Sequence, residues 1–275
     1  MAERMYVLTG VAALTSAMCL TASAQDLNRL TPAEKAAGWQ LLFDGATLNG
    51  WEDPSQKHPP GDAWTLEDGS LKARAHPRIR EDLISARHFG DFELTFDWRI
   101  SAGGNSGLKY RIQKTVFVRD RPAGEGKFED LVEMALRGRR NERVAPGQDY
   151  VIAFEYQVID EARNPDAARG GIQQAGALYD LVAPSGHPAR PAGEFNHSRI
   201  LLRGNHVEHW MNGIKIVETD LSSAAIADGL AKRWGRGSAV YELLTHQPQK
   251  VCPISLQNHG DDAWFRNLKI RPLGP

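Results

Sequence analysis

A strictly alternating segment at residues 154–160 constrains the fold most strongly. Its aromatic and aliphatic residues would face one side of a β-strand, and Glu155 and Gln157 the other, because successive side chains in a strand point to opposite faces. Taken alone, this pattern is typical of a half-buried strand whose polar face is solvated. The segment therefore predicts a sheet with one face in a core and one polar face.

A second segment, at residues 105–112, has the same design. Its apolar residues alternate with Lys109 and Arg111, which would share the opposite face. If the two strands lie in one sheet with their polar faces together, a carboxylate, an amide and two cations converge. A solvated face needs no such arrangement, whereas a site for a polar, oxygen-rich ligand does.

The rest of the chain consists mainly of short strands separated by turns. A ten-residue strand is expected at 91–100, and the pairs at 68–69 (Asp-Gly) and 212–213 (Asn-Gly) are hairpin turns. Helices are expected only at 30–37 and 128–136, while 222–234 could be a helix or a crossing loop. This pattern predicts an all-β fold, a jelly-roll β-sandwich with few short helices.

The N-terminus has the pattern of a signal peptide at residues 1–24. Arg4 precedes an apolar run, and the small residues Ala22 and Ala24 mark a cleavage site before Gln25. We expect export to a bacterial periplasm or secretion, without stable membrane association after cleavage; an uncleaved anchor is the alternative. Cys252 would then be the only cysteine, which excludes an intramolecular disulfide.

The mature chain reads as one domain. Residues 25–37 form an N-terminal segment with a short helix, and 38–275 a single jelly-roll domain. Residues 114–150 interrupt the strand pattern and read as an insertion: a lid, an oligomer contact or a surface excursion. The formal net charge of -1 gives no support for nucleic-acid binding.

Alternation extends the polar face towards the C-terminus. In residues 254–259, the aliphatic side chains belong to the core, so Gln257 and His259 would share the opposite face. Arg266 lies in the last strand and is a further candidate for that face, but its orientation stays open, because the apolar residues of that strand cannot all point one way without a bulge.

These segments resemble the 3-keto-disaccharide hydrolase domain family, long a domain of unknown function. The matching motifs run in order through the chain: LLFDG (41–45), LNGW (48–51), NSGLKYR (105–111), EYQVID (155–160), GALYD (176–180), VEHWMNG (207–213), LQNHG (256–260) and WFRN (264–267). The resemblance implies a jelly roll of the concanavalin A-like or laminin G-like type. It also implies export and action on glycosides whose sugar carries a ketone at C3. The insertion at 114–150 departs from the expected family pattern.

A ketone at C3 acidifies the proton on C2, so the group at C1 can leave by β-elimination and water can then add to C1. We expect Glu155 to be the base, Lys109 and Arg111 to stabilise the enolate, and His259 to act as an acid or a second base. Asp160 could pair with Glu155 in direct two-carboxylate hydrolysis, or only shape the turn that follows.

The remaining candidates would bind the sugar. Asn105, Gln157 and Gln257 are expected to fix its hydroxyl groups, with Arg266, Tyr179 and His209 as further candidates. Tyr179 also fits a rim or core aromatic residue, and His209 a packed histidine. No cofactor is predicted, because no dense ligand spacing is present, but His209, His259 and Glu155 are ligand types and leave a divalent metal open.

Three readings therefore compete. The first is an enzyme that cleaves 3-keto-glycosides by net hydrolysis, or a lyase or hydratase that performs one half of that sequence. The second is a non-catalytic carbohydrate-binding module, since jelly rolls serve both roles. The third is an interaction domain that uses residues 114–150 as its contact. The enzyme reading implies a 3-keto-sugar substrate and, as one source of the ketone, a partner sugar oxidoreductase.

Overall fold

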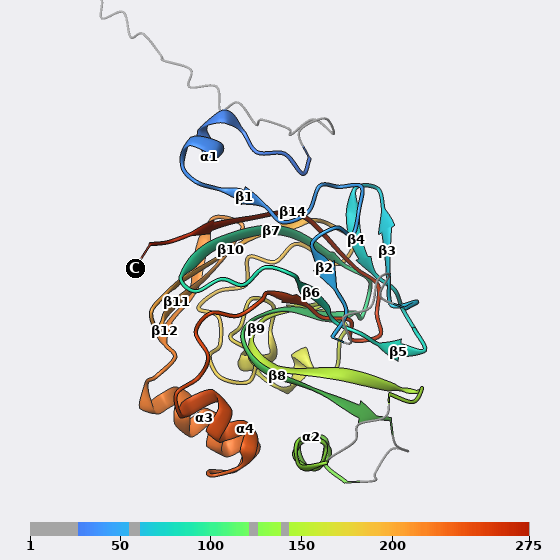
Figure 1. The fold of residues 1–275 in the computed structure, drawn as a ribbon, viewed down its shortest axis with the longest axis vertical. Helices are drawn as coiled ribbons and strands as arrows, with labels where there is room; N and C mark the ends of the chain where they lie inside the picture. The colour runs from blue at the N-terminus through green and yellow to red at the C-terminus, as the bar shows by residue number, and fades with distance from the viewer. Residues whose placement is uncertain (1–26, 55–60, 121–125, 139–142, 275) are drawn as a thin grey trace, which may run out of the picture.

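The computed structural model describes residues 27–54, 61–120, 126–138 and 143–274. Two β-sheets pack face to face, and three helices lie beyond the smaller sheet, on the side away from the larger one (Figure 1). The predicted all-β jelly-roll sandwich with few short helices is confirmed. The predicted signal peptide at 1–24 lies outside the described residues. Within the described ranges, no helix is long and apolar enough to span a membrane.

The larger sheet has eight strands, with β1 paired to β14 beside the main path. In spatial order its strands are β12 (Ile214–Asp220), β11 (His206–Met211), β10 (Asn196–Arg203), β7 (Phe92–Ile100), β14 (Ala263–Pro272), β4 (Ser70–Ala73) and β3 (Trp64–Glu67), with β1 at Gln40–Leu41. The expected long strand and both expected hairpins are present in it.

The smaller sheet has six strands. Their spatial order is β2 (Trp51–Glu52), β6 (Leu83–Ser85), β13 (Ser255–Leu256), β8 (Asn105–Arg119), β9 (Gly147–Ile159) and β5 (Ile79–Arg80). The two segments expected to share a sheet are thus direct antiparallel neighbours, and Lys109 stands opposite Glu155. Residues 114–150 contain strand at both ends, since 114–119 belong to β8 and 147–150 to β9.

Large aromatic side chains fill the space between the sheets. The rings of Phe96 and Tyr156 meet edge to face with centroids 5.4 Å apart, a favourable geometry for aromatic pairs. The polar atoms of the aromatic residues are hydrogen-bonded inside the core. Trp98 Nε1 donates to Ser198 Oγ over 2.9 Å, and Tyr156 Oη lies 2.7 Å from the same oxygen. The apolar face of the segment at 154–158 therefore lies in the core, as its alternation predicts.

Four α-helices are present among the described residues: α1 (Pro32–Ala36), α2 (Phe128–Arg137), α3 (Ala224–Trp234) and α4 (Ala239–Thr245). The segment at 222–234 is mostly helical, and α4 was not expected. Glu133 of α2 accepts hydrogen bonds from the amides of Ala239 and Val240, over 3.0 and 2.9 Å. Because a helix leaves its first amides without partners, this carboxylate ties α2 to the start of α4.

Candidate active site

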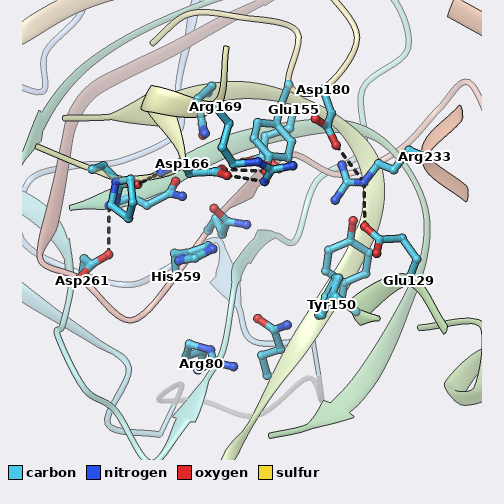
Figure 2. A pocket seen from close by; sticks show the side chains of 18 residues that line it. Arg80, Glu129, Tyr150, Glu155, Asp166, Arg169, Asp180, Arg233, His259 and Asp261 are labelled. Atoms are coloured by element: carbon cyan, nitrogen blue, oxygen red, sulfur yellow. Dashed lines mark hydrogen bonds and ion pairs between the residues drawn. The ribbon is translucent and has the colours of Figure 1, made fainter. Parts of the chain in front are cut away.

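A cavity of about 660 Å³ opens on the outer face of the smaller sheet. Its lining comes from β8, β9 and the segment after β13, together with α2, the loop that follows β9 and the end of α3 (Figure 2). Six of the predicted site residues line it: Asn105, Glu155, Gln157, Tyr179, Gln257 and His259. The polar faces that alternation assigned to three separate strands therefore meet at one cavity.

Glu155 occupies a restricted position on the cavity floor. Its carboxylate fits over Gly107 of β8, where a Cβ atom would lie 2.2 Å from Glu155 Oε1. Burial raises the pKa of Glu155 to about 7, although Lys109 acts in the opposite direction. A carboxylate whose pKa lies near neutrality can both take up and release a proton under physiological conditions.

Lys109 lies beneath the floor. Its Nζ is 2.9 Å from Asp82 Oδ2, and the two side chains are only 2% and 1% exposed. Burial opposes the charge on Lys109, but Asp82 and Glu155 outweigh it and raise the pKa of Lys109. Burial raises the pKa of Asp82, while Lys109 and the hydrogen bonds that Asp82 accepts from Ser255 Oγ and the Asn258 amide act in the opposite direction. One buried cation is therefore shared between two carboxylates.

The carboxamide of Gln257 links these groups. In the orientation that satisfies both neighbours, its oxygen accepts from Lys109 Nζ over 3.2 Å and its nitrogen donates to Glu155 Oε1 over 3.3 Å. This arrangement fixes one oxygen of Glu155 and leaves the other available to a ligand. Gln257 thus orients the carboxylate as well as facing the cavity.

His259 and Asn105 face the same space. The imidazole of His259 is exposed to the cavity, yet desolvation by the surrounding chain lowers its pKa and favours the neutral form. Asn105 is only 6% exposed, and its Oδ1 has no hydrogen-bond partner among the described residues. Because a buried acceptor without a donor is costly, this atom is suited to receive a ligand hydroxyl.

Ion pairs form the cavity wall, and sequence reasoning missed them. Arg169 pairs with Asp166 at 2.5 Å, and the same carboxylate accepts from the Tyr179 hydroxyl over 2.8 Å. Arg233 of α3 lies 3.2 Å from Asp180 and 3.5 Å from Glu129 of α2. These residues come from helices and loops, in which no alternating pattern marks a face, and only Tyr179 among them was a predicted site residue.

Arg111 does not join the site, so the prediction that it shares a face with Lys109 is wrong. The β8–β9 pairing is regular up to Tyr110 and then shifts register before Lys114. Arg111 adopts a positive φ of 55° there and turns to a different cavity, where it donates to the carbonyl oxygens of Lys250 and Gly204. A register shift breaks the two-residue period on which the prediction depended.

Asp160 shapes the turn after β9, the second of its two predicted roles. Its carboxylate accepts from the amides of Gly103 and Ala162, over 2.7 and 3.1 Å, and it does not line the cavity. Direct hydrolysis by an Asp160–Glu155 pair is therefore not supported by the geometry. Asp160 instead fixes the loop that carries Asp166 and Arg169.

The structure also places His209 and Arg266 away from the cavity, contrary to their prediction as sugar-binding residues. His209 is fully buried between the sheets, 2.9 Å from both Tyr110 Oη and the Gly176 carbonyl oxygen. The expected irregularity in β14 is present after Arg266, but β14 belongs to the larger sheet, where the Arg266 guanidinium stacks on Phe195. Neither residue lines the cavity.

With this geometry established, comparison with known proteins decides the family. Residues 38–271 match the model of the 3-keto-alpha-glucoside-1,2-lyase-like domain. The chain belongs to this family. It is 32% identical over 263 residues to a 3-keto-disaccharide hydrolase of Bacteroides thetaiotaomicron, a match covering 91% of this chain and 83% of that protein. This member of the 3-keto-alpha-glucoside-1,2-lyase-like family is therefore a glycoside hydrolase-like enzyme.

Solved structures agree on the fold. A putative glycosyl hydrolase from Parabacteroides distasonis superimposes with a TM-score of 0.65 at 26% identity, covering 90% of this chain and all of that one. A second putative glycosyl hydrolase from the same organism gives a TM-score of 0.55 at 23% identity, over 86% and 99% of the two chains. The sandwich of this 3-keto-alpha-glucoside-1,2-lyase-like protein is thus shared with glycosyl hydrolase-like proteins.

The three residues that the sequence offered as possible metal ligands do not come together. His209 lies between the sheets, while His259 and Glu155 line the cavity. Within the described part of this family member, one group has metal-ligand spacing: His206, Glu208 and Glu218, whose ligand atoms lie within 4.8 Å of one another. It lies on the β11–β12 hairpin, where Lys215 already pairs with both glutamates.

Proposed function

We propose that this enzyme cleaves 3-keto-glycosides, 3-keto-disaccharides among them, with Glu155 as the base that removes the proton on C2. The observation that carries the proposal is a half-buried carboxylate in a sugar-sized cavity, whose pKa burial raises to about 7 although Lys109 and Arg233 act in the opposite direction. Such a group can exchange a proton with a weakly acidic carbon, and a solvated glutamate is far less suited to that task.

The reaction would proceed by elimination and hydration. Glu155 takes the C2 proton, and the electron pair of the C2–H bond passes to the ketone oxygen as an enolate. Collapse of the enolate forms a C1–C2 double bond and breaks the bond from C1 to the leaving oxygen, which receives the proton held by Glu155. Water then adds to C1 as a proton returns to C2, so the net change is hydrolysis.

His259 suits the hydration half of this sequence. Its lowered pKa keeps the imidazole neutral near pH 7, and a neutral imidazole accepts a proton more readily than it donates one. We assign to His259 the role of taking a proton from the water that adds to C1. His259 then transfers that proton to C2. Of its two expected roles, second base is therefore favoured over acid.

Amide groups around the cavity supply the sugar-binding contacts. The unpaired Oδ1 of Asn105 would accept from a sugar hydroxyl, and Gln157 and Gln257 face the same space from β9 and from the end of β13. Tyr179, whose hydroxyl is fixed by Asp166, would offer its ring as a wall of the site. Neutral amides and hydroxyls of this kind can both donate to and accept from sugar hydroxyls.

Turnover of a 3-keto-disaccharide, with its unoxidised parent as the control substrate, tests the proposal. Glu155→Gln should abolish cleavage of the keto sugar, whereas Glu194→Gln, at an exposed carboxylate, should leave it unchanged. In deuterated water the product should carry deuterium at C2. Cleavage of the parent sugar at a similar rate, or full activity of Glu155→Gln, would refute the proposal.

The same experiment separates hydrolase from lyase. Accumulation of an unsaturated ketone with the leaving group released would show that the enzyme performs only elimination. We further propose that a sugar oxidoreductase supplies the ketone and that residues 1–24 direct export to the periplasm or outside the cell. N-terminal sequencing of the protein recovered from that compartment should begin at Gln25.

A further inference from the structure

Two hydrogen-bond donors in the cavity have no acceptor among the residues that the structure describes. The Tyr150 hydroxyl has no hydrogen-bond partner in the described part of the chain, and the same is true of the terminal nitrogens of Arg233. Arg233 Nε is buried without a hydrogen-bond partner, whereas the Tyr150 hydroxyl and the terminal nitrogens of Arg233 are not among such buried atoms and belong to residues that line the cavity. Placed hydrogen-bond donors that face an enzyme cavity are candidates for binding developing negative charge.

Arg233 is held with its terminal nitrogens free. Its Nε lies between Asp180 and Glu129, and the centre of its guanidinium is 5.2 Å from the Tyr179 ring and 4.9 Å from the Trp234 ring. Figure 2 shows both ion pairs meeting at one side of the guanidinium, with the rest turned into the cavity. The side chain is therefore fixed, while its strongest donors remain available.

Tyr150 is held just as firmly from below. Its ring meets Phe128 of α2 edge to face, with centroids 5.0 Å apart, and Lys109 Nζ lies 5.6 Å from its centre. Burial raises its pKa, so the phenol stays protonated and can donate. Its hydroxyl points towards the side of the cavity where Arg233 lies (Figure 2).

We propose that Tyr150 and Arg233 together bind the ketone oxygen at C3 of the substrate and stabilise the enolate that forms there. This inference rests on the proposed function and adds its electrophilic half. As Glu155 takes the C2 proton, the electron pair moves into the C2–C3 bond and the ketone oxygen gains a negative charge. Two fixed donors on that oxygen would lower the barrier without rearranging.

The other cations near the cavity are less suited to this task. Arg80 forms a two-point contact with Asp120, over 3.2 and 2.5 Å, which engages both of its terminal nitrogens. Arg169 is 61% exposed and paired with Asp166, and Lys109 lies below the floor with Asp82. Arg111, which the sequence suggested as a group that stabilises the enolate, lies at another cavity. Arg233 takes that role instead.

Deuterium exchange at C2 isolates the step in question. The probe is a 3-keto sugar with hydrogen in place of the leaving group at C1, which can form the enolate but cannot be cleaved. Loss of one fixed donor typically slows such a step by about 100- to 1000-fold, so Tyr150→Phe and Arg233→Met should each exchange at least about 100-fold more slowly than the wild type. Arg233→Lys should retain part of the rate.

Matched substitutions control for fold. Tyr241→Phe removes a hydroxyl that contacts Arg236, and Arg236→Met removes an exposed ion pair; both lie outside the cavity lining and should exchange at the wild-type rate. Tyr150→Phe deletes no hydrogen bond and should unfold at the wild-type temperature. Wild-type exchange in Tyr150→Phe and in Arg233→Met would overturn the oxyanion assignment alone. Absence of both exchange and cleavage in the wild type would instead overturn the proposed function.

Discussion

Replacing Glu155 by glutamine should stabilise the folded protein above neutral pH while removing its proposed base. The pKa of Glu155 is raised from its ordinary value of 4.5 to about 7, chiefly by burial. Between these values the unfolded chain loses the proton that the folded chain still holds, so wild-type stability falls as the pH rises. Glutamine cannot ionise and escapes this penalty.

The magnitude follows from the two pKa values. A tenfold change in an ionisation constant is worth about 1.4 kcal/mol, so the rise from 4.5 to about 7 corresponds to roughly 3 kcal/mol as an upper figure. In a chain of this size each kcal/mol moves Tm by about 2–4 °C. Glu155→Gln should therefore unfold up to about 6–12 °C higher than the wild type at pH 8, and at nearly the same temperature at pH 4.5.

Thermal unfolding followed by circular dichroism at both pH values measures the effect. Only the difference between the variant and the wild type matters, because all other titrating groups are common to both. Glu194→Gln, at an exposed position, should show no difference at either pH. An equal Tm difference at pH 4.5 and pH 8, or a lower Tm for Glu155→Gln at pH 8, would refute the reasoning.

Three further predictions follow from the cavity floor. In Gly107→Ala, the added methyl would lie 2.2 Å from Glu155 Oε1, so turnover should fall at least about 100-fold; Gly186→Ala, where the Cβ has open space, should leave it unchanged. Wild-type kcat/KM should rise with pH around a midpoint near 7, as the carboxylate forms, and a flat profile would contradict this role. Asp82→Asn should move that midpoint to lower pH, because it removes a negative charge that raises the pKa of Glu155 and frees Lys109; an unchanged or higher midpoint would count against the shared cation.

Alternation in the sequence was sufficient to place the floor of the site. Side chains along a regular strand keep a two-residue period, so the core contacts of Tyr156 fix the opposite direction for Glu155. The same argument placed Lys109 on its neighbour strand, and the register sets the two directly across from each other. The same argument failed two residues later, at Arg111. A register shift leaves no mark in the sequence that distinguishes it from regular strand.

The cavity wall could not be predicted in this way. Arg233 comes from the last turn of α3 and Asp166 from a loop, and tertiary packing alone brings them to the sheet. Tyr150 shows the limit within a single strand. It is five residues from Glu155, which puts it on the opposite face of a flat strand, yet both line the cavity where the β8–β9 pairing is irregular.

The two glutamates of α2 limit how this enzyme can be altered by exchanging loops. Glu129 holds Arg233, and Glu133 serves the first amides of α4. A shorter loop grafted between β8 and β9 would remove both the contact of Glu129 with Arg233 and the contacts of Glu133 with α4. The graft would therefore alter the chemistry as well as substrate access. Residues 120–146 and the pair α3–α4 therefore form one exchangeable unit, and a chimera that transfers either part alone should lose activity even where its new loop fits the sugar.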